Sequence, residues 1–122
     1  MPHLSRTEEI GRYGERVAAA FVRRRGYRVL TRNFQSERGE IDLVCRQGNV
    51  LVFVEVRARA GTQFGRPAES IDERKQGALE NAAQDYLQLL DRDDITYRFD
   101  AVEVRMRAGE VPGCTLLPNI FS

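Results

Sequence analysis

Apolar residues recur at helical spacing in two stretches of the chain. In the first stretch, Ile10, Val17 and Phe21 fall on one side of a helix that we expect from Thr7 to about Arg25. The glycine that follows this helix is a typical terminator. Two amphipathic helices are therefore expected, one near the start of the chain and one in its second half.

The second helix is expected from Ser70 to about Leu90. It begins with the capping-box pattern Ser70-Ile71-Asp72-Glu73. Its apolar stripe consists of Ile71, Ala78, Leu79, Ala82, Tyr86 and Leu90.

Two glycines interrupt the first helix. Gly11 and Gly14 should each cost up to about 1 kcal/mol inside a helix. We therefore expect another segment to approach the helix backbone closely at this point.

Strand patterns fill most of the remaining chain. We expect strands over residues 27–34, 40–46, 50–59 and 95–105. The last strand must reach the others through a right-handed crossover that contains the second helix. The order helix, three strands, helix, strand predicts an α/β fold with a mixed central sheet flanked by helices.

The second and third strands form a hairpin with a predictable register. Gly48 and Asn49 suit a two-residue turn, which pairs Gln47 with Val50. One face is then apolar, with Ile41 opposite Val56, Leu43 opposite Val54 and Cys45 opposite Val52. The other face holds Glu40 opposite Arg57, Asp42 opposite Glu55, and Val44 opposite Phe53.

The pair of acidic residues on that second face is the most informative feature of the sequence. Like charges directly opposite each other on paired strands are destabilising. A divalent cation between Asp42 and Glu55 would convert the repulsion into binding. The alternative is a solvated hairpin face whose acids are neutralised by Arg57 and nearby arginines.

Length and composition indicate one globular domain over residues 1–122. Apolar residues make up 42% of the chain and charged residues 30%, a balance that excludes a disordered protein. No stretch has the pattern of a signal peptide or a membrane span, so we expect a cytoplasmic protein with no membrane partner. The apolar tail, about residues 108–122, is expected either to pack on the sheet or to form a homodimer contact.

The scarcity of histidine and cysteine restricts the chemistry. His3 is the only histidine, and the two cysteines are too few for a zinc cluster. Any metal must therefore be held by carboxylates, which favours Mg²⁺ or Mn²⁺.

Basic residues concentrate in the first third of the chain. Residues 5–38 hold nine arginines and four glutamates, which makes this segment the expected phosphate-facing surface. The candidate nucleic-acid contacts are Arg12, Arg23, Arg24 and Arg59. The alternative is an ordinary solvated helix face.

Lys75 is the only lysine among 19 basic residues, and it falls within the apolar stripe of the second helix. A snorkelling stem is the simplest explanation for such a position.

An ordered set of residues spread over nearly the whole chain carries a family resemblance. The set consists of Glu15, Gly39-Glu40-Ile41-Asp42-Leu43, Phe53-Val54-Glu55-Val56-Arg57-Ala58-Arg59, Phe64-Gly65, Lys75 and Arg98-Phe99-Asp100. It resembles the YraN-type bacterial proteins. That family is similar in turn to the PD-(D/E)XK nucleases, including archaeal Holliday-junction resolvases and type II restriction enzymes.

The resemblance implies a restriction-endonuclease-like three-layer core and a site for Mg²⁺ or Mn²⁺. Asp42 and Glu55 match the acidic metal ligands, and Glu15 matches a helix glutamate that would complete the cluster through water. Glu40, Arg98 and Asp100 are interpreted as residues around the ligands. For Arg98 and Asp100, which share a strand face, an internal ion pair is the alternative.

The chain departs from the nuclease motif at its lysine, which is Arg57 here. Arginine stays protonated, so it can stabilise a phosphate but is a poor base. Arg57 would then act electrostatically, or Lys75 would supply the ammonium group, or the site would bind without catalysis. The corresponding hypotheses are a metal-dependent endonuclease for branched or non-standard DNA, a non-catalytic nucleic-acid-binding module, and a structural partner in a DNA repair or recombination assembly.

Overall fold

The computed structural model describes residues 6–60 and 73–121, and the helices and strands in this part follow the predicted order. They are α1 (Arg6–Arg24), β1 (Arg28–Ser36), β2 (Gly39–Gln47), β3 (Val50–Ala60), α2 (Glu73–Leu90), β4 (Thr96–Met106) and β5 (Gly113–Leu117). Each predicted boundary that can be compared agrees within two residues. The predicted start of the second helix at Ser70 lies outside the described residues. β5 is an addition to the predicted set.

The strands form one mixed sheet in the order β1-β2-β3-β4-β5. β3 and β4 are parallel, and the other neighbouring pairs are antiparallel. The connection between the parallel strands β3 and β4 contains α2, as parallel pairing requires a long connection. The predicted α/β architecture with a mixed sheet is therefore confirmed.

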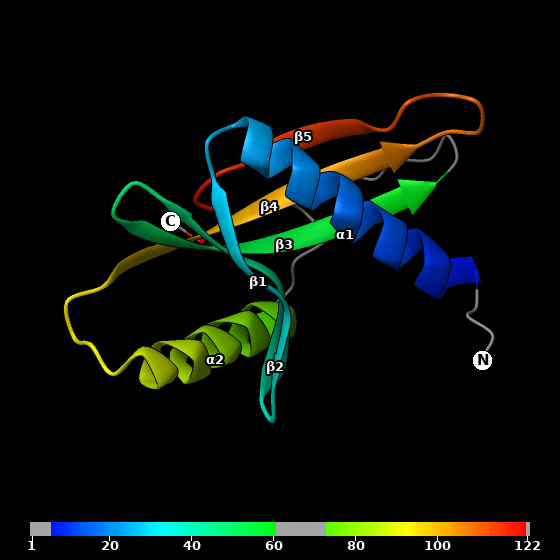
Figure 1. The fold of residues 1–122 in the computed structure, drawn as a ribbon. Coiled ribbons are helices and arrows are strands. Elements are labelled where there is room, and N and C mark those ends of the chain that lie inside the picture. Colours follow the sequence, from blue (N-terminus) through cyan, green and yellow to red (C-terminus); the bar gives the residue numbers. More distant parts are fainter. Residues whose placement is uncertain (1–5, 61–72, 122) are drawn as a thin grey trace.

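A helix covers each face of the sheet, so both faces are buried in the middle. Along β3 the side chains alternate: Val52 and Val54 pack with the core under α1, and Leu51 and Phe53 pack with the core under α2. Figure 1 shows α1 lying across β3 and β4. The sheet is therefore the middle of three layers.

The β2–β3 hairpin has the predicted register, but its two strands separate just before the acidic pair. The pairs run from Gln47 with Val50 to Leu43 with Val54. The sequence predicts Asp42 directly opposite Glu55 at the next position. Instead, the Val56 N–H donates to Asp42 Oδ2 over 2.7 Å, so a side-chain oxygen serves in place of a β2 carbonyl.

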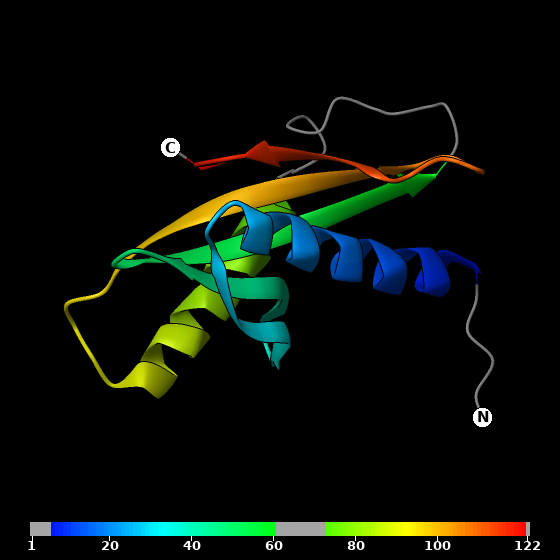
Figure 2. The same ribbon diagram turned by 45° about the horizontal axis from the view of Figure 1, so that its top comes forward.

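Ile41 packs in a different layer from the one that a regular hairpin predicts. The pattern places Ile41 on the same face as Leu43 and Cys45. Ile41 is fully buried, but it belongs to the α2 core with Phe53, whereas Leu43 and Cys45 belong to the α1 core. The prediction is wrong because β2 turns out of the layer formed by β3, β4 and β5 and follows β1 (Figure 2).

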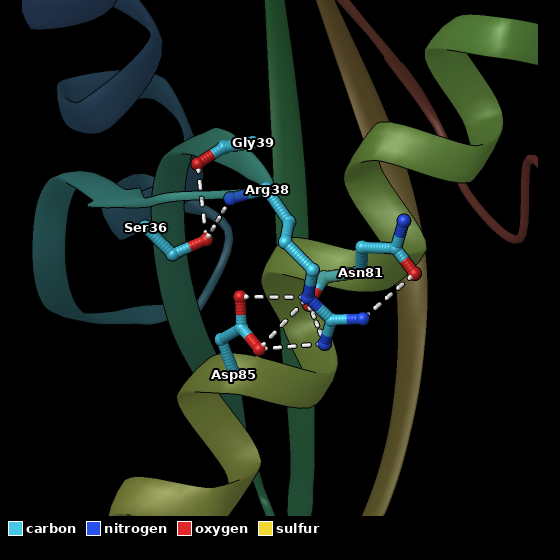
Figure 3. A network of polar contacts seen from close by, with 5 residues as sticks. All are labelled: Ser36, Arg38, Gly39, Asn81 and Asp85. Carbon is cyan, nitrogen blue, oxygen red and sulfur yellow. Dashed lines mark hydrogen bonds and ion pairs between the residues drawn. The ribbon is translucent and has the colours of Figure 1, made fainter.

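Arg38, in the turn between β1 and β2, connects this turn to α2 (Figure 3). Arg38 Nη2 donates to Asp85 Oδ1 over 2.6 Å, and Arg38 Nη1 donates to Asn81 Oδ1 over 3.4 Å. Gly39 approaches the α2 backbone so closely that a Cβ there would lie 2.5 Å from Ala78 O. These contacts fix the start of β2, from which its acidic side chains project.

The predicted close approach to the first helix is confirmed at one of the two glycines. A Cβ on Gly14 would overlap Ala58 Cβ of β3, so glycine lets α1 lie directly on the strand that carries Glu55. Nothing lies within 4 Å of a Cβ built on Gly11.

The apolar tail packs on the sheet. β5 pairs antiparallel with β4, and Leu116 packs against the α1 core. After β5, the ring of Phe121 lies 5.0 Å from that of Phe99, measured between centroids. No helix among the described residues combines the length and apolar character needed to cross a membrane.

Candidate functional site

Most of the predicted site residues line one open cleft of about 780 Å³, bounded by α1, β1, β2, β3 and the start of α2. The lining residues include Glu15, Asn33, Glu40, Asp42, Arg57, Arg59, Arg12 and Lys75. The cleft therefore collects several carboxylates and several cationic groups from distant parts of the chain.

Asp42 is the most strongly perturbed carboxyl group in the cleft. Burial raises the pKa of Asp42 from 3.8 to about 6, although the hydrogen bond from the Val56 N–H favours the charged form. The carboxylates of Glu55, Glu15 and Glu40 raise it further. The charged form of Asp42 is therefore held in an unfavourable field of like charges.

Glu55 contrasts with Asp42 because cations surround it. Its side chain is buried, at 4% exposure, with Oε1 2.5 Å from Lys75 Nζ and Oε2 3.4 Å from Arg57 Nη2. Lys75 is half exposed, so its stem runs inward to Glu55 while part of the side chain stays in water. The only lysine of the chain thus lies next to a predicted metal ligand.

Glu15 comes from α1 and lies near Asp42 and Glu40. Burial raises the pKa of Glu15, Arg32 lowers it, and the Glu40 carboxylate raises it. Arg32 Nε lies 3.7 Å from Glu15 Oε1. Glu15 is therefore only partly neutralised.

Arg57 is a buried cation with incomplete pairing. Its side chain is 6% exposed, and its Nε and Nη1 atoms are buried without a hydrogen-bond partner among the described residues. In the β3–β4 register Arg57 is the neighbour of Glu103, another buried charged residue. Arg57 is also among the residues that line the cleft, so it contributes a positive charge beside the acidic groups there.

Other predicted residues lie elsewhere. Arg98 Nε donates to Asp100 Oδ1 over 3.1 Å in a network with Tyr27, and neither residue lines the cleft. Arg98 and Asp100 therefore form the internal ion pair that was expected as the alternative to a place around the metal ligands. Arg23 and Arg24 are exposed in the last turn of α1 and also lie outside the cleft lining.

The oxygen atoms of the candidate ligands are of the type that divalent cations prefer, but the ligands are few. Asp42 and Glu55 offer hard carboxylate oxygens. Among the described residues, no three acidic, histidine or cysteine side chains are grouped as ligands for a metal ion. Mg²⁺ commonly keeps several waters and takes only one or two protein carboxylates, so this pair fits its requirements.

Asn33 also lines the cleft, although it was not predicted to be a site residue. Asn33 has a φ of 56° within β1, an unusual backbone conformation for a strand. The only signal in the sequence is an asparagine inside a strand pattern, where this residue type is uncommon.

Comparisons with known proteins agree with the resemblance to YraN-type bacterial proteins. A model of the uncharacterised protein family UPF0102 matches residues 14–104. A UPF0102 protein of Caldicellulosiruptor saccharolyticus is 40% identical over 114 residues, which cover 93% of this chain and 97% of the relative. A UPF0102 protein of Syntrophomonas wolfei is 42% identical over 84% of this chain and 89% of its own length. For a UPF0102 protein of Hahella chejuensis the identity is 39%, with 98% and 94% covered. The chain therefore belongs to the uncharacterised protein family UPF0102.

Proposed function

We propose that this protein is a metal-dependent nuclease that hydrolyses DNA phosphodiesters in the cleft around Asp42. The observation that carries the proposal is the open cleft, in which Asp42 lies with other carboxylates beside Arg57 and Lys75. Burial and the neighbouring carboxylates also raise the pKa of Asp42 to about 6. Such repulsion has no structural benefit, whereas perturbed carboxyl groups in an open cleft are typical of functional sites. A cation bound there would relieve the repulsion.

In this proposal Asp42 and Glu55 hold Mg²⁺ or Mn²⁺, and Glu15 contributes through water. The Val56 N–H orients the Asp42 carboxylate through Oδ2 and leaves Oδ1 available for the cation. A bound divalent cation supplies two effects, a lower pKa of its coordinated water and neutralisation of charge on the phosphate.

The cationic residues would bind the phosphodiester. Arg57 lines the cleft, and its permanent positive charge would stabilise a phosphate bound there. Lys75 reaches the same place from α2, and its ammonium group would turn from Glu55 to the phosphate when a cation occupies Glu55. Arg12 and Arg59 at the cleft wall would hold the flanking backbone, with Arg23 and Arg24 further along α1.

The substrate that suits this chain is branched or otherwise non-standard DNA. A domain of 122 residues has little room for a module that reads base sequence. Recognition would then depend on the shape of the DNA and on its phosphates.

The test is a cleavage assay on duplex, single-stranded and four-way-junction DNA, with Mg²⁺, with Mn²⁺ and with EDTA. The wild type should cut at least one substrate with a metal and none with EDTA, and Asp42→Asn should cut none. Asp94→Asn, the same change at an exposed carboxylate that pairs with Arg92 outside the cleft, is the matched control and should cut normally. A wild type that cuts nothing, or an Asp42→Asn variant that cuts equally, would refute the proposal.

A second candidate function is a nucleic-acid-binding module without catalysis. The observation that favours it is the pairing of Glu55 with Lys75 and Arg57, which already neutralises one of the two metal ligands. Under this alternative, the wild type binds branched DNA equally well with metal and with EDTA and cuts nothing.

A further inference from the structure

Asn33 has a backbone conformation that is unusual inside a strand. Three non-glycine residues in the described chain have positive φ: Asn33, Asp91 and Asn119. Asp91 follows the last residue of α2, and Asn119 follows β5, where left-handed residues commonly end an element or form a turn. Asn33 instead lies inside β1, between residues that pair with β2.

The register places Asn33 at the level of Asp42. Arg32 pairs with Leu43 and Phe34 pairs with Ile41, so Asn33 occupies the position between them, across from Asp42. Asn33 is exposed and lines the cleft. The unusual conformation therefore occurs next to Asp42, the proposed metal ligand on β2.

The acidic residues on the side of the cleft where Asn33 lies explain why an amide is suitable there. Glu15, Glu40 and Asp42 make the wall acidic, so a phosphate approaching it meets repulsion. A carboxamide offers two N–H donors to a phosphate oxygen and carries no charge that would pair with these carboxylates. Asparagine is also among the few non-glycine residues that adopt positive φ readily.

We propose that the Asn33 carboxamide donates a hydrogen bond to a phosphate oxygen of the nucleic-acid backbone, on the side of Asp42 opposite to Arg57 and Lys75. This inference rests on the proposed function of the cleft. It adds a neutral substrate contact from β1 to the charged groups from β3 and α2. Backbone strain retained at a cleft residue is consistent with such a role.

A purely structural role for Asn33 makes a different prediction. Its left-handed backbone helps β1 turn towards α2, where Phe34 packs against the α2 core. Glycine adopts positive φ without strain and has no carboxamide. Asn33→Gly therefore keeps the turn of the strand and removes only the proposed contact.

The experiment measures the affinity for four-way-junction and duplex DNA in EDTA, the single-turnover cleavage rate in Mg²⁺, and Tm. Asn33→Gly should weaken DNA binding about three- to tenfold, the range expected for one neutral hydrogen bond, with Tm unchanged or raised. Asn33→Asp should weaken it further, because it adds a charge to the acidic wall. Asp91→Gly, which relaxes the same type of backbone conformation at the end of α2, should bind and cut normally.

Each outcome distinguishes this inference from the proposed function. A wild type that binds and cuts, with Asn33→Gly equal to it in affinity and rate, overturns the contact and leaves the proposed function standing. A wild type that binds no DNA overturns both. Reduced affinity of Asn33→Gly with intact Tm supports the contact, whereas reduced affinity accompanied by a lower Tm assigns Asn33 to the fold and overturns it.

Discussion

Replacing Asp42 with asparagine should stabilise the protein at neutral pH. The change removes a charge that is disfavoured first by burial and then by the carboxylates of Glu55, Glu15 and Glu40. It also keeps a side-chain oxygen that can accept the hydrogen bond from Val56 N. Most polar substitutions at a half-buried position destabilise a protein, so a gain in stability would indicate that the charge of Asp42 is penalised in the folded state.

The magnitude follows from the pKa. In the unfolded chain Asp42 ionises near 3.8, and in the folded protein near 6, a difference worth up to about 3 kcal/mol. Below pH 3.8 the group is protonated in both states and has no effect on stability. As pH rises from 3.8 to about 6, the unfolded state loses its proton first, so the penalty grows, and above about 6 it is constant. Asp42→Asn should remove this penalty, which for a chain of this size is roughly 10 °C in Tm.

The assay is urea or thermal unfolding of both proteins in EDTA between pH 3.5 and pH 7.5, a range of about four units that spans both pKa values. Asp85→Asn is a control that should change the free energy of unfolding in the opposite direction. The hydrogen bond from Arg38 lowers the pKa of Asp85, so its charge stabilises the folded state above the unfolded pKa and this benefit is lost as pH falls. Asp85→Asn should therefore destabilise at pH 7 and have little effect in acid. If Asp42→Asn destabilises the protein equally at both ends of the range, the charge of Asp42 carries no penalty in the folded state.

Three further predictions concern the packing of α1, the basic surface and the cationic groups of the cleft. Gly14→Ala should lower the free energy of unfolding by about 1–3 kcal/mol, because the new Cβ would overlap β3, whereas Gly11→Ala should raise it by up to about 1 kcal/mol. Urea titration compares the two, and equal effects would show that α1 does not pack as described. Replacing the arginines at residues 23–25 with glutamine should weaken binding to all DNA sequences and reduce the slope of log K against log salt by up to about 3. An unchanged slope would place the binding surface elsewhere. Lys75→Met should abolish single-turnover cleavage with little change in DNA affinity, and Arg57→Lys should preserve or raise the rate. An active Lys75→Met variant would exclude Lys75 from catalysis.

The order and limits of the helices and strands could be predicted because burial imposes its period on the sequence. The Gly48-Asn49 turn also determined the register of β2 and β3 over five pairs. The prediction failed where the backbone departs from regularity. Ile41 changes layer because β2 leaves β3, and a departure of this kind depends on how α2 holds the β1–β2 turn. β5 is short and lies between two prolines, which weakened its strand pattern.

Part of the candidate site could be predicted because it depends on the regular register of the β2–β3 hairpin. The hairpin register, a local property of the sequence, predicts that Asp42 lies near Glu55. The strands separate before this pair, but Glu55 is still near enough to raise the pKa of Asp42. The contact between Lys75 and Glu55 depends on how α2 docks on the sheet, which no local pattern determines. Asn33 was missed because its role depends on a single φ angle inside a strand, and residue type alone does not indicate such an angle.

The central claim is that Asp42 and Glu55 form a site for a divalent cation. Its most direct test is the Tm of the wild type, Asp42→Asn and Asp85→Asn, each with EDTA, with Mg²⁺ and with Mn²⁺ at pH 7 and without DNA. Either metal should raise the Tm of the wild type and of Asp85→Asn by mass action, and should raise that of Asp42→Asn much less. Equal shifts in the wild type and Asp42→Asn, or no shift in any of the proteins, would contradict a metal site at this cleft.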